Sequence, residues 1–153
     1  MLVLTSPDFN QGETIPVRFT CDGDDVSPAF RWANLPEGTV ELLFEMDDPD
    51  APGGIFRHWA AWGIAPESGF LRSGFGAATL EPGFQQAIND FGKPGYGGPC
   101  PPQGDTPHSY HFRLSALREE LTAAAPGATC EEIVALAQPT VIEFTELVGF
   151  YGR

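Results

Sequence analysis

The sequence predicts a mainly β protein: an antiparallel β-sandwich of two sheets with one or two peripheral helices. Three observations favour this class. Glycine (18 residues) and proline (15 residues) are frequent and spread along the whole chain of 153 residues, which is typical of short strands joined by turns. Short runs of apolar and aromatic residues lie between these turns. Only the segment that begins at Thr129 carries a strong helix signal.

The first half of the chain supplies the first candidate strands, over residues 2–4, 17–19, 30–32, 40–46 and 59–64. The turn residues Pro36 and Gly38 lie between the third and the fourth of these, so we expect those two strands to pair as a hairpin. Residues 68–88 are rich in glycine and show no clear periodicity, which favours a loop.

The second half carries the clearest local signals. In residues 110–117, Tyr110, Phe112 and Leu114 alternate with other residues and are expected to face the core of a strand. Thr129 and Glu132 have the spacing of a capping box, so a helix should begin there. Pro139 should end it or begin a new first turn. Residues 146–151 are predicted to form the last strand.

Length and composition predict a single globular domain over residues 1–153, with 42% hydrophobic residues. The 21 acidic and 8 basic residues give a net charge of −13, which excludes nucleic acid and disfavours electrostatic docking on anionic membranes. No apolar stretch has the length of a membrane span, and the N-terminal residues do not resemble a signal peptide. We therefore expect a cytoplasmic protein.

The three cysteines, Cys21, Cys100 and Cys130, are few, odd in number and far apart. This pattern favours free thiols in a reducing compartment. Cys21 and Cys130 are expected to be small apolar side chains of the core, whereas Cys100, in a loop rich in glycine and proline, should be more exposed. Their spacing matches no metal site, and no cofactor is expected.

Two stiff loops each lead to a histidine near a predicted strand. Residues 47–54 carry Asp48 and Asp50 and precede His58, and residues 95–107 lead into His108 and Tyr110. A carboxylate close to His58 would favour the imidazolium form, which together with the second histidine and the hydroxyl could bind an anion. The same residues also fit a structural role, with Asp48 capping turn amides and His58 half buried.

Catalytic alternatives have weaker support. Asp48, Asp50, His58 and His108 could hold a hydrolytic metal, but no established zinc-ligand spacing is present. Ser109 follows His108 directly, and neighbours in a strand point to opposite faces, so these two residues predict no catalytic triad.

With both loops considered, the chain resembles the phosphatidylethanolamine-binding protein family, also called Raf kinase inhibitor-like proteins, and in particular its short bacterial and archaeal branch. The resemblance covers nearly the whole chain and rests on residues 21–28, 48–52, 58–59, 89–92, 95–99, 101–104, 108–110 and 146–153. Each motif alone is weak, and together they are specific. The resemblance implies the same fold, two antiparallel sheets with peripheral helices.

The resemblance also implies a small pocket for phosphate-like anions or phospholipid head groups. Its motif positions place in that pocket Asp48, His58, Pro102, His108 and Tyr110, with loop backbone near Gly98 and Cys100. A cis bond between Ala51 and Pro52 is implied as well. The family usually has arginine where this chain has Ser109, which removes a positive charge unless Arg57 supplies one.

The sequence thus predicts a ligand-binding regulatory protein that is not an enzyme. Its expected partner is a phosphate-like anion or a phospholipid head group. An alternative is an interaction protein that inhibits a kinase or protease through its surface, and a metal-dependent hydrolase is a remote third. A homodimer is left open.

Overall fold

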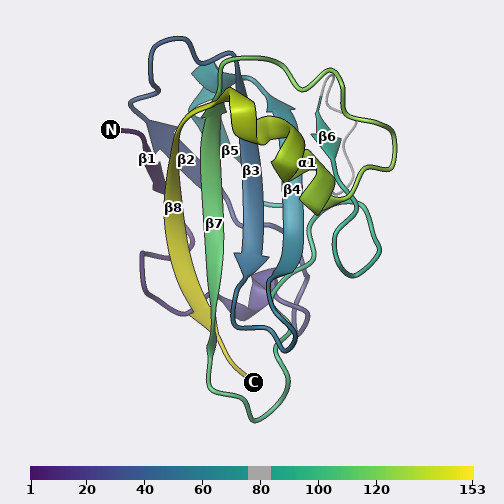
Figure 1. The fold of residues 1–153 in the computed structure, drawn as a ribbon. Helices are drawn as coiled ribbons and strands as arrows, with labels where there is room; N and C mark the ends of the chain where they lie inside the picture. Colours follow the sequence, from purple (N-terminus) through teal and green to yellow (C-terminus); the bar gives the residue numbers. More distant parts are fainter. Residues whose placement is uncertain (76–83) are drawn as a thin grey trace.

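The computed structural model describes residues 1–75 and 84–153, which form two antiparallel sheets (Figure 1). In the three-stranded sheet the order is β1 (Val3–Thr5), β2 (Phe30–Ala33), β5 (Phe70–Leu71). In the five-stranded sheet the order is β6 (Gln85–Gln86), β4 (Phe56–Ile64), β3 (Glu41–Asp48), β7 (His108–Leu117), β8 (Val141–Tyr151). The predicted β-sandwich is confirmed.

The main core fills the space between the two sheets. Phe30 on β2 lies 5.2 Å from Phe44 on β3 and 5.3 Å from Phe112 on β7, measured between ring centroids. Tyr110, Phe112 and Leu114 are fully buried, as their alternation along the sequence predicts. These aromatic contacts join strands of different sheets, so they fix how the two layers pack.

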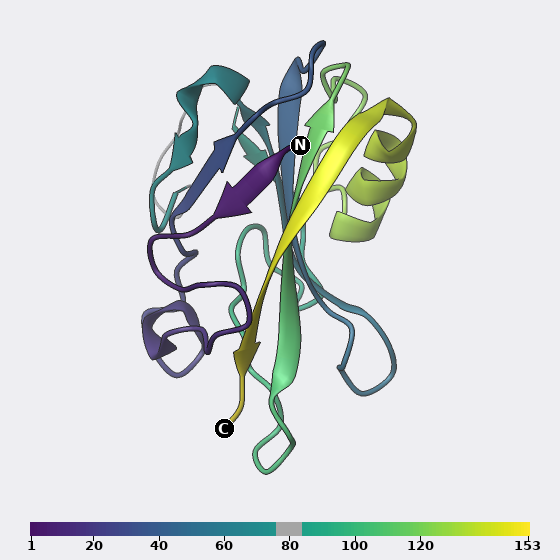
Figure 2. The same ribbon diagram turned by 90° about the vertical axis from the view of Figure 1, so that its left-hand side faces the viewer.

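The helix α1 (Cys130–Ala137) covers the opposite face of the five-stranded sheet (Figure 2). Its buried Ile133 and Ala137 belong to a second apolar cluster with Leu43 of β3 and Ala60 of β4. The predicted capping box is present: the Thr129 side chain accepts a hydrogen bond from the Glu132 backbone N–H, and the Glu132 side chain accepts one from the Thr129 backbone N–H.

Two other stretches for which the sequence makes a prediction form short 3₁₀ helices. Residues Val17–Phe19 form the helical turn η1 and not a strand, because the Phe19 N–H donates to the Pro16 carbonyl at 3.0 Å. Pro139 lies at the start of η3 (Gln138–Thr140), as a new first turn requires. A third, η2, spans Pro66–Ser68.

Two predictions about strands are wrong. Phe30 to Trp32 pairs with β1 and β5, not with the strand that follows it, because the apolar face of β2 packs across the core against β3. The stretch 68–88, expected to be a loop, contains β5 and β6; its residues 76–83 lie outside the described part of the chain.

Cys21 and Cys100 form a disulfide, with Cα atoms 5.4 Å apart, so the prediction that they are free thiols is wrong. The two loops meet side by side, since the Cys21 N–H also donates to the Pro99 carbonyl at 3.1 Å. The separation of 79 residues hides this contact in the sequence. Cys130 is a free, buried thiol of the second cluster, as predicted.

Candidate functional site

The candidate site lies where β3 ends and where β4 and β7 begin. Neighbouring antiparallel strands run in opposite directions, so Asp48 at the end of β3 comes next to the starts of the other two. A cavity of about 290 Å³ lies there, lined by Asp48, Ala51, Pro52, Phe56, His58, Phe91, Cys100, Pro101, Pro102, His108 and Tyr110. This lining includes six of the seven site residues predicted from sequence; the exception is Gly98.

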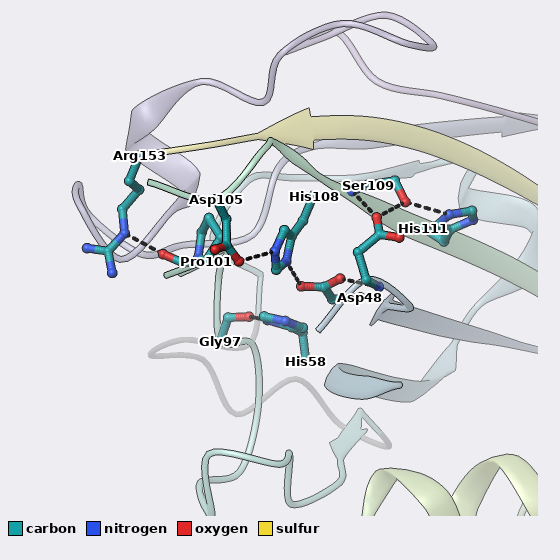
Figure 3. Close-up of polar contacts among 10 residues, drawn as sticks. Asp48, His58, Gly97, Pro101, Asp105, His108, Ser109, His111 and Arg153 are labelled. Atoms are coloured by element: carbon teal, nitrogen blue, oxygen red, sulfur yellow. Dashed lines mark hydrogen bonds and ion pairs between the residues drawn. The ribbon is translucent and has the colours of Figure 1, made fainter. Parts of the chain in front are cut away.

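His108 is held between two carboxylates (Figure 3). Its Nδ1 lies 2.7 Å from Asp48 Oδ2, and its Nε2 lies 3.1 Å from Asp105 Oδ2. With a carboxylate at each nitrogen, both nitrogens act as donors, which only the protonated ring can do. Burial lowers the pKa of His108, but the bonds to Asp48 and then to Asp105 outweigh it, and the pKa is raised. This ring carries the positive charge of the site.

His58 is the neutral histidine of the pair, although a carboxylate close to it was expected to favour the imidazolium form. Its Nδ1 lies 2.7 Å from the Gly97 carbonyl, which can only accept, so Nδ1 carries the hydrogen and Nε2 is left as an acceptor. Burial of the side chain lowers its pKa more than the nearby carbonyl and carboxylate raise it. The Asp48 carboxylate is instead bonded to His108.

Tyr110 places a fully buried hydroxyl at the cavity, and this hydroxyl has no hydrogen-bond partner in the protein. Burial raises the pKa of Tyr110, and the nearby Asp48 carboxylate raises it further, so the hydroxyl stays protonated. The two oxygens of Asp48 are engaged by the Asp50 backbone N–H, at 2.8 Å, and by His108. Asp48 could accept a further bond, and its carboxylate lies near the Tyr110 hydroxyl, but the geometry of a hydrogen bond between them is not met. The hydroxyl is therefore a donor that a ligand in the cavity can use.

Asp50 and Ser109 face away from this group. The backbone N–H and the Oγ–H of Ser109 both donate to Asp50 Oδ2 at 2.7 Å, and Ser109 Oγ lies 3.2 Å from His111 Nε2. Neither residue lines the cavity. Ser109, at the position where the resemblance implies an arginine, therefore removes no charge from the cavity lining itself. Arg57 does not compensate, because it pairs with Asp47, at 3.5 Å, on the outer face of the sheet.

Gly98 does not line the cavity, but it lets the loop that carries Cys100 pack closely against the loop of Phe19 and Asp25. Its N–H donates to Asp25 Oδ1 at 2.7 Å, and a Cβ atom at this position would lie 2.3 Å from the Phe19 carbonyl oxygen. Glycine is required for this close approach of two loops. The Ala51–Pro52 bond is trans, contrary to the implied cis bond. Gly54 N–H closes a turn onto the Ala51 carbonyl at 3.1 Å with Gly53 at φ 90°, as in a type II turn with a trans proline.

Sequence reasoning missed Asp105, a partner of His108, and five residues of the cavity lining: Ala51, Pro52, Phe56, Phe91 and Pro101. Phe56 and Phe91 form an apolar wall, with ring centroids 4.7 Å apart, and Phe91 belongs to a motif that the resemblance had already marked. Asp105 is the second partner of His108, and only its position three residues before that histidine could have suggested it. Within residues 1–75 and 84–153, no group of three or more His, Cys, Asp or Glu side chains is placed to hold a metal ion.

Comparisons with known proteins agree with this fold. The sequence model of the phosphatidylethanolamine-binding protein family matches residues 5–152. The chain is 40% identical over 148 residues to the UPF0098 protein of Aquifex aeolicus, covering 97% of this chain and 86% of that protein. It is 44% identical over 128 residues to the putative lipoprotein LppC of Mycobacterium tuberculosis, covering 84% of this chain and 61% of that protein.

The crystal structure of Escherichia coli YbcL, described as a new member of the mammalian PEBP family, superposes with a TM-score of 0.93 at 30% identity. The superposition covers 99% of this chain and 98% of that one. Fold, motifs and family match coincide, and the chain belongs to the phosphatidylethanolamine-binding protein family.

Proposed function

We propose that the protein binds a small ligand reversibly in the cavity beside Asp48, His58 and His108, and that the ligand is a phosphate-type anion or a phospholipid head group. The observation that carries this proposal is the Tyr110 hydroxyl, which is fully buried and has no partner. A buried polar group without a hydrogen bond costs about 1–3 kcal/mol, and a ligand acceptor would recover that cost.

The polar groups of the cavity indicate the ligand's chemistry. Tyr110 supplies a donor, and neutral His58 leaves Nε2 as an acceptor. A hydrogen phosphate, or a phosphate ester that also carries an O–H or N–H group, can satisfy both. Ala51, Pro52, Phe56 and Phe91 supply the apolar part of the wall, which fits a short carbon chain attached to the phosphate.

Binding without turnover is the expected behaviour of this site. The Ser109 hydroxyl, which the sequence places directly after His108, donates to Asp50 and lies outside the cavity lining. The imidazolium of His108 has both N–H groups engaged and cannot act as a base. Neutral His58 keeps Nε2 as an acceptor, but no hydroxyl or thiol of the described residues is hydrogen bonded to it. Inhibition of a kinase or protease stays a prediction that no contact in the structure specifically favours.

The cytoplasmic location also stays a prediction, and the Cys21–Cys100 disulfide weighs against it, because such bonds persist mainly in oxidising compartments. The mycobacterial relative is named a putative lipoprotein. Among the described residues, no helix has the length and apolar character needed to cross a bilayer.

Tyr110→Phe tests the proposal because it removes only the unpartnered hydroxyl. Calorimetric titration with inorganic phosphate and with phosphoethanolamine should show affinity weakened about tenfold or more, since a hydrogen bond to a charged acceptor is lost. The unliganded variant should be as stable as the wild type, or more stable, because no protein hydrogen bond disappears.

Tyr96→Phe is the matched control. The Tyr96 hydroxyl donates to the Phe19 carbonyl at 2.7 Å and lies outside the cavity lining, so this variant should lose about 1 kcal/mol of stability and keep its affinity. Equal affinity of wild type and Tyr110→Phe for both ligands would refute the proposed role of the cavity.

A further inference from the structure

We infer that Asp105 is an internal competitor for the anion: its carboxylate accepts the Nε2–H bond of His108 that an incoming phosphate would otherwise accept. The inference rests on the proposed function and adds the residue that sets affinity and anion selectivity. It follows from the unequal way in which the two carboxylates beside His108 are held.

The Asp48 carboxylate is a fixed partner. It is buried, its Oδ2 lies 2.7 Å from His108 Nδ1, and its Oδ1 accepts the Asp50 backbone N–H at 2.8 Å. Moving it would leave a buried carboxylate without its bonds, which is costly. A ligand therefore cannot take the place of this oxygen, and Nδ1 is not available to it.

The Asp105 carboxylate is a replaceable partner. Its distance to His108 Nε2 is longer, at 3.1 Å, and 43% of its side chain is exposed, against 5% for Asp48. Because water solvates the Asp105 carboxylate even while it is bonded to His108, the bond adds little free energy, and breaking it costs little. The exposed bond is the weaker of the two and the one that an anion can displace.

The surrounding loop lets the carboxylate leave without unfolding. The backbone around Asp105 is tethered: Gly104 N–H donates to the Arg153 carbonyl at 3.1 Å, and Arg153 Nε donates to the Pro101 carbonyl at 2.8 Å. Asp105 and Arg153 also line an open groove that shares no lining residue with the cavity. A side-chain rotation into that groove would release His108 Nε2 and keep the carboxylate in water near a guanidinium group.

Charge gives this exchange its selectivity. A singly charged imidazolium faces two carboxylates, so an anion that bound beside Asp105 would be repelled, whereas a singly charged anion that replaced it would leave the local net charge unchanged. The incoming anion must be a better acceptor than a hydrated carboxylate. Phosphate, with more charge and more oxygens, meets this condition, and acetate does not.

The test compares phosphate affinity by calorimetric titration in Asp105→Ala, Asp105→Asn and the wild type. Both variants should bind phosphate about three- to tenfold more tightly, and acetate should become measurable as a competitor. Asp50→Asn is the charge-matched control, since its carboxylate is exposed, lies near His108 and occupies neither ring nitrogen. Its affinity should change less than about twofold. In a His108→Ala background the gain from Asp105→Ala should vanish.

Each other outcome overturns the inference. Suppose that Asp105→Ala binds phosphate no more tightly than the wild type, while wild-type binding still depends on His108. This result would refute the role of Asp105 as a competitor and would leave the proposed function unaffected. A gain in Asp105→Asn alone would mean that the new amide donates to the anion. A gain of equal size in Asp50→Asn would reduce the effect to net charge. An absence of phosphate binding by all these proteins would end both the inference and the proposed function.

Discussion

Removing the disulfide should cost this protein a large part of its stability. The bond joins Cys21, two residues after the turn η1, to Cys100, which lines the candidate cavity. Cys21→Ser with Cys100→Ser opens the cross-link with minimal change in side-chain size. Because the two loops remain hydrogen bonded through Pro99, the native fold should persist and the effect should fall mainly on the unfolded chain.

The magnitude follows from the length of chain that the bond closes. For residues separated by 79 positions, the loop-entropy relation gives about 15 cal/mol/K, or about 4.5 kcal/mol at about 25 °C. Measured values for native disulfides are typically about 2–5 kcal/mol. Domains of this kind have about 5–15 kcal/mol of stability in total, so the expected loss is a large fraction.

Urea unfolding followed by tryptophan fluorescence measures this loss. Wild-type protein treated with a phosphine reductant is the control, since it removes the bond and keeps both sulfur atoms; it should lose the same free energy as the double variant. A loss below about 1 kcal/mol in both proteins would refute the reasoning from loop length. A loss in the variant alone would assign the effect to the serine side chains.

Two further predictions concern other parts of the fold. Glu45 is buried, and burial, followed by the charge of Asp47, raises its pKa from 4.5 to about 7. The folded state then keeps a proton that the unfolded state releases, so stability should fall by about 3 kcal/mol between about pH 4.5 and pH 7. The urea midpoint of Glu45→Gln should be less sensitive over this range; an equal slope in both proteins would contradict the assignment. Thr129→Ala breaks the capping box of α1 and should cost about 1 kcal/mol, whereas Thr129→Ser should restore most of it, as thermal unfolding of the two variants will show.

Local signals in the sequence predicted the local parts of the fold. The alternation of Tyr110, Phe112 and Leu114 determines which face of β7 is buried, and the capping box of Thr129 determines where α1 begins. Both depend on neighbours a few residues apart. The partner of β2 could not be predicted this way, because aromatic packing between Phe30 and strands of the other sheet decides it. Non-local contact also explains why the disulfide was missed.

In the candidate site too, the residues on strands could be predicted from the sequence and the geometry of the loops could not. Asp48, His108 and Tyr110 lie at strand ends, so a correct strand assignment and the family motifs together place them around one cavity. Which histidine carries the charge could not be read from the sequence. That choice depends on the Gly97 carbonyl reaching His58, and on a loop conformation that brings Asp105 to His108. Both are loop geometries, for which residue type and periodicity give little information.

The cavity holds polar groups whose burial and hydrogen bonding conflict with the rules that predict the rest of the fold, as does the unpartnered Trp62 Nε1, which lies outside its lining. A stable core would leave no hydroxyl without a partner and would not bury a charged ring between carboxylates. Here the Tyr110 hydroxyl has no partner, and the charged His108 ring is buried between two carboxylates. Such conflicts lower stability, and folded proteins usually retain them where a ligand resolves them. A phosphate group would give Tyr110 its acceptor and could release Asp105 to solvent. If the proposed binding holds, the same unresolved contacts that cost stability in the free protein would become binding energy for the phosphate.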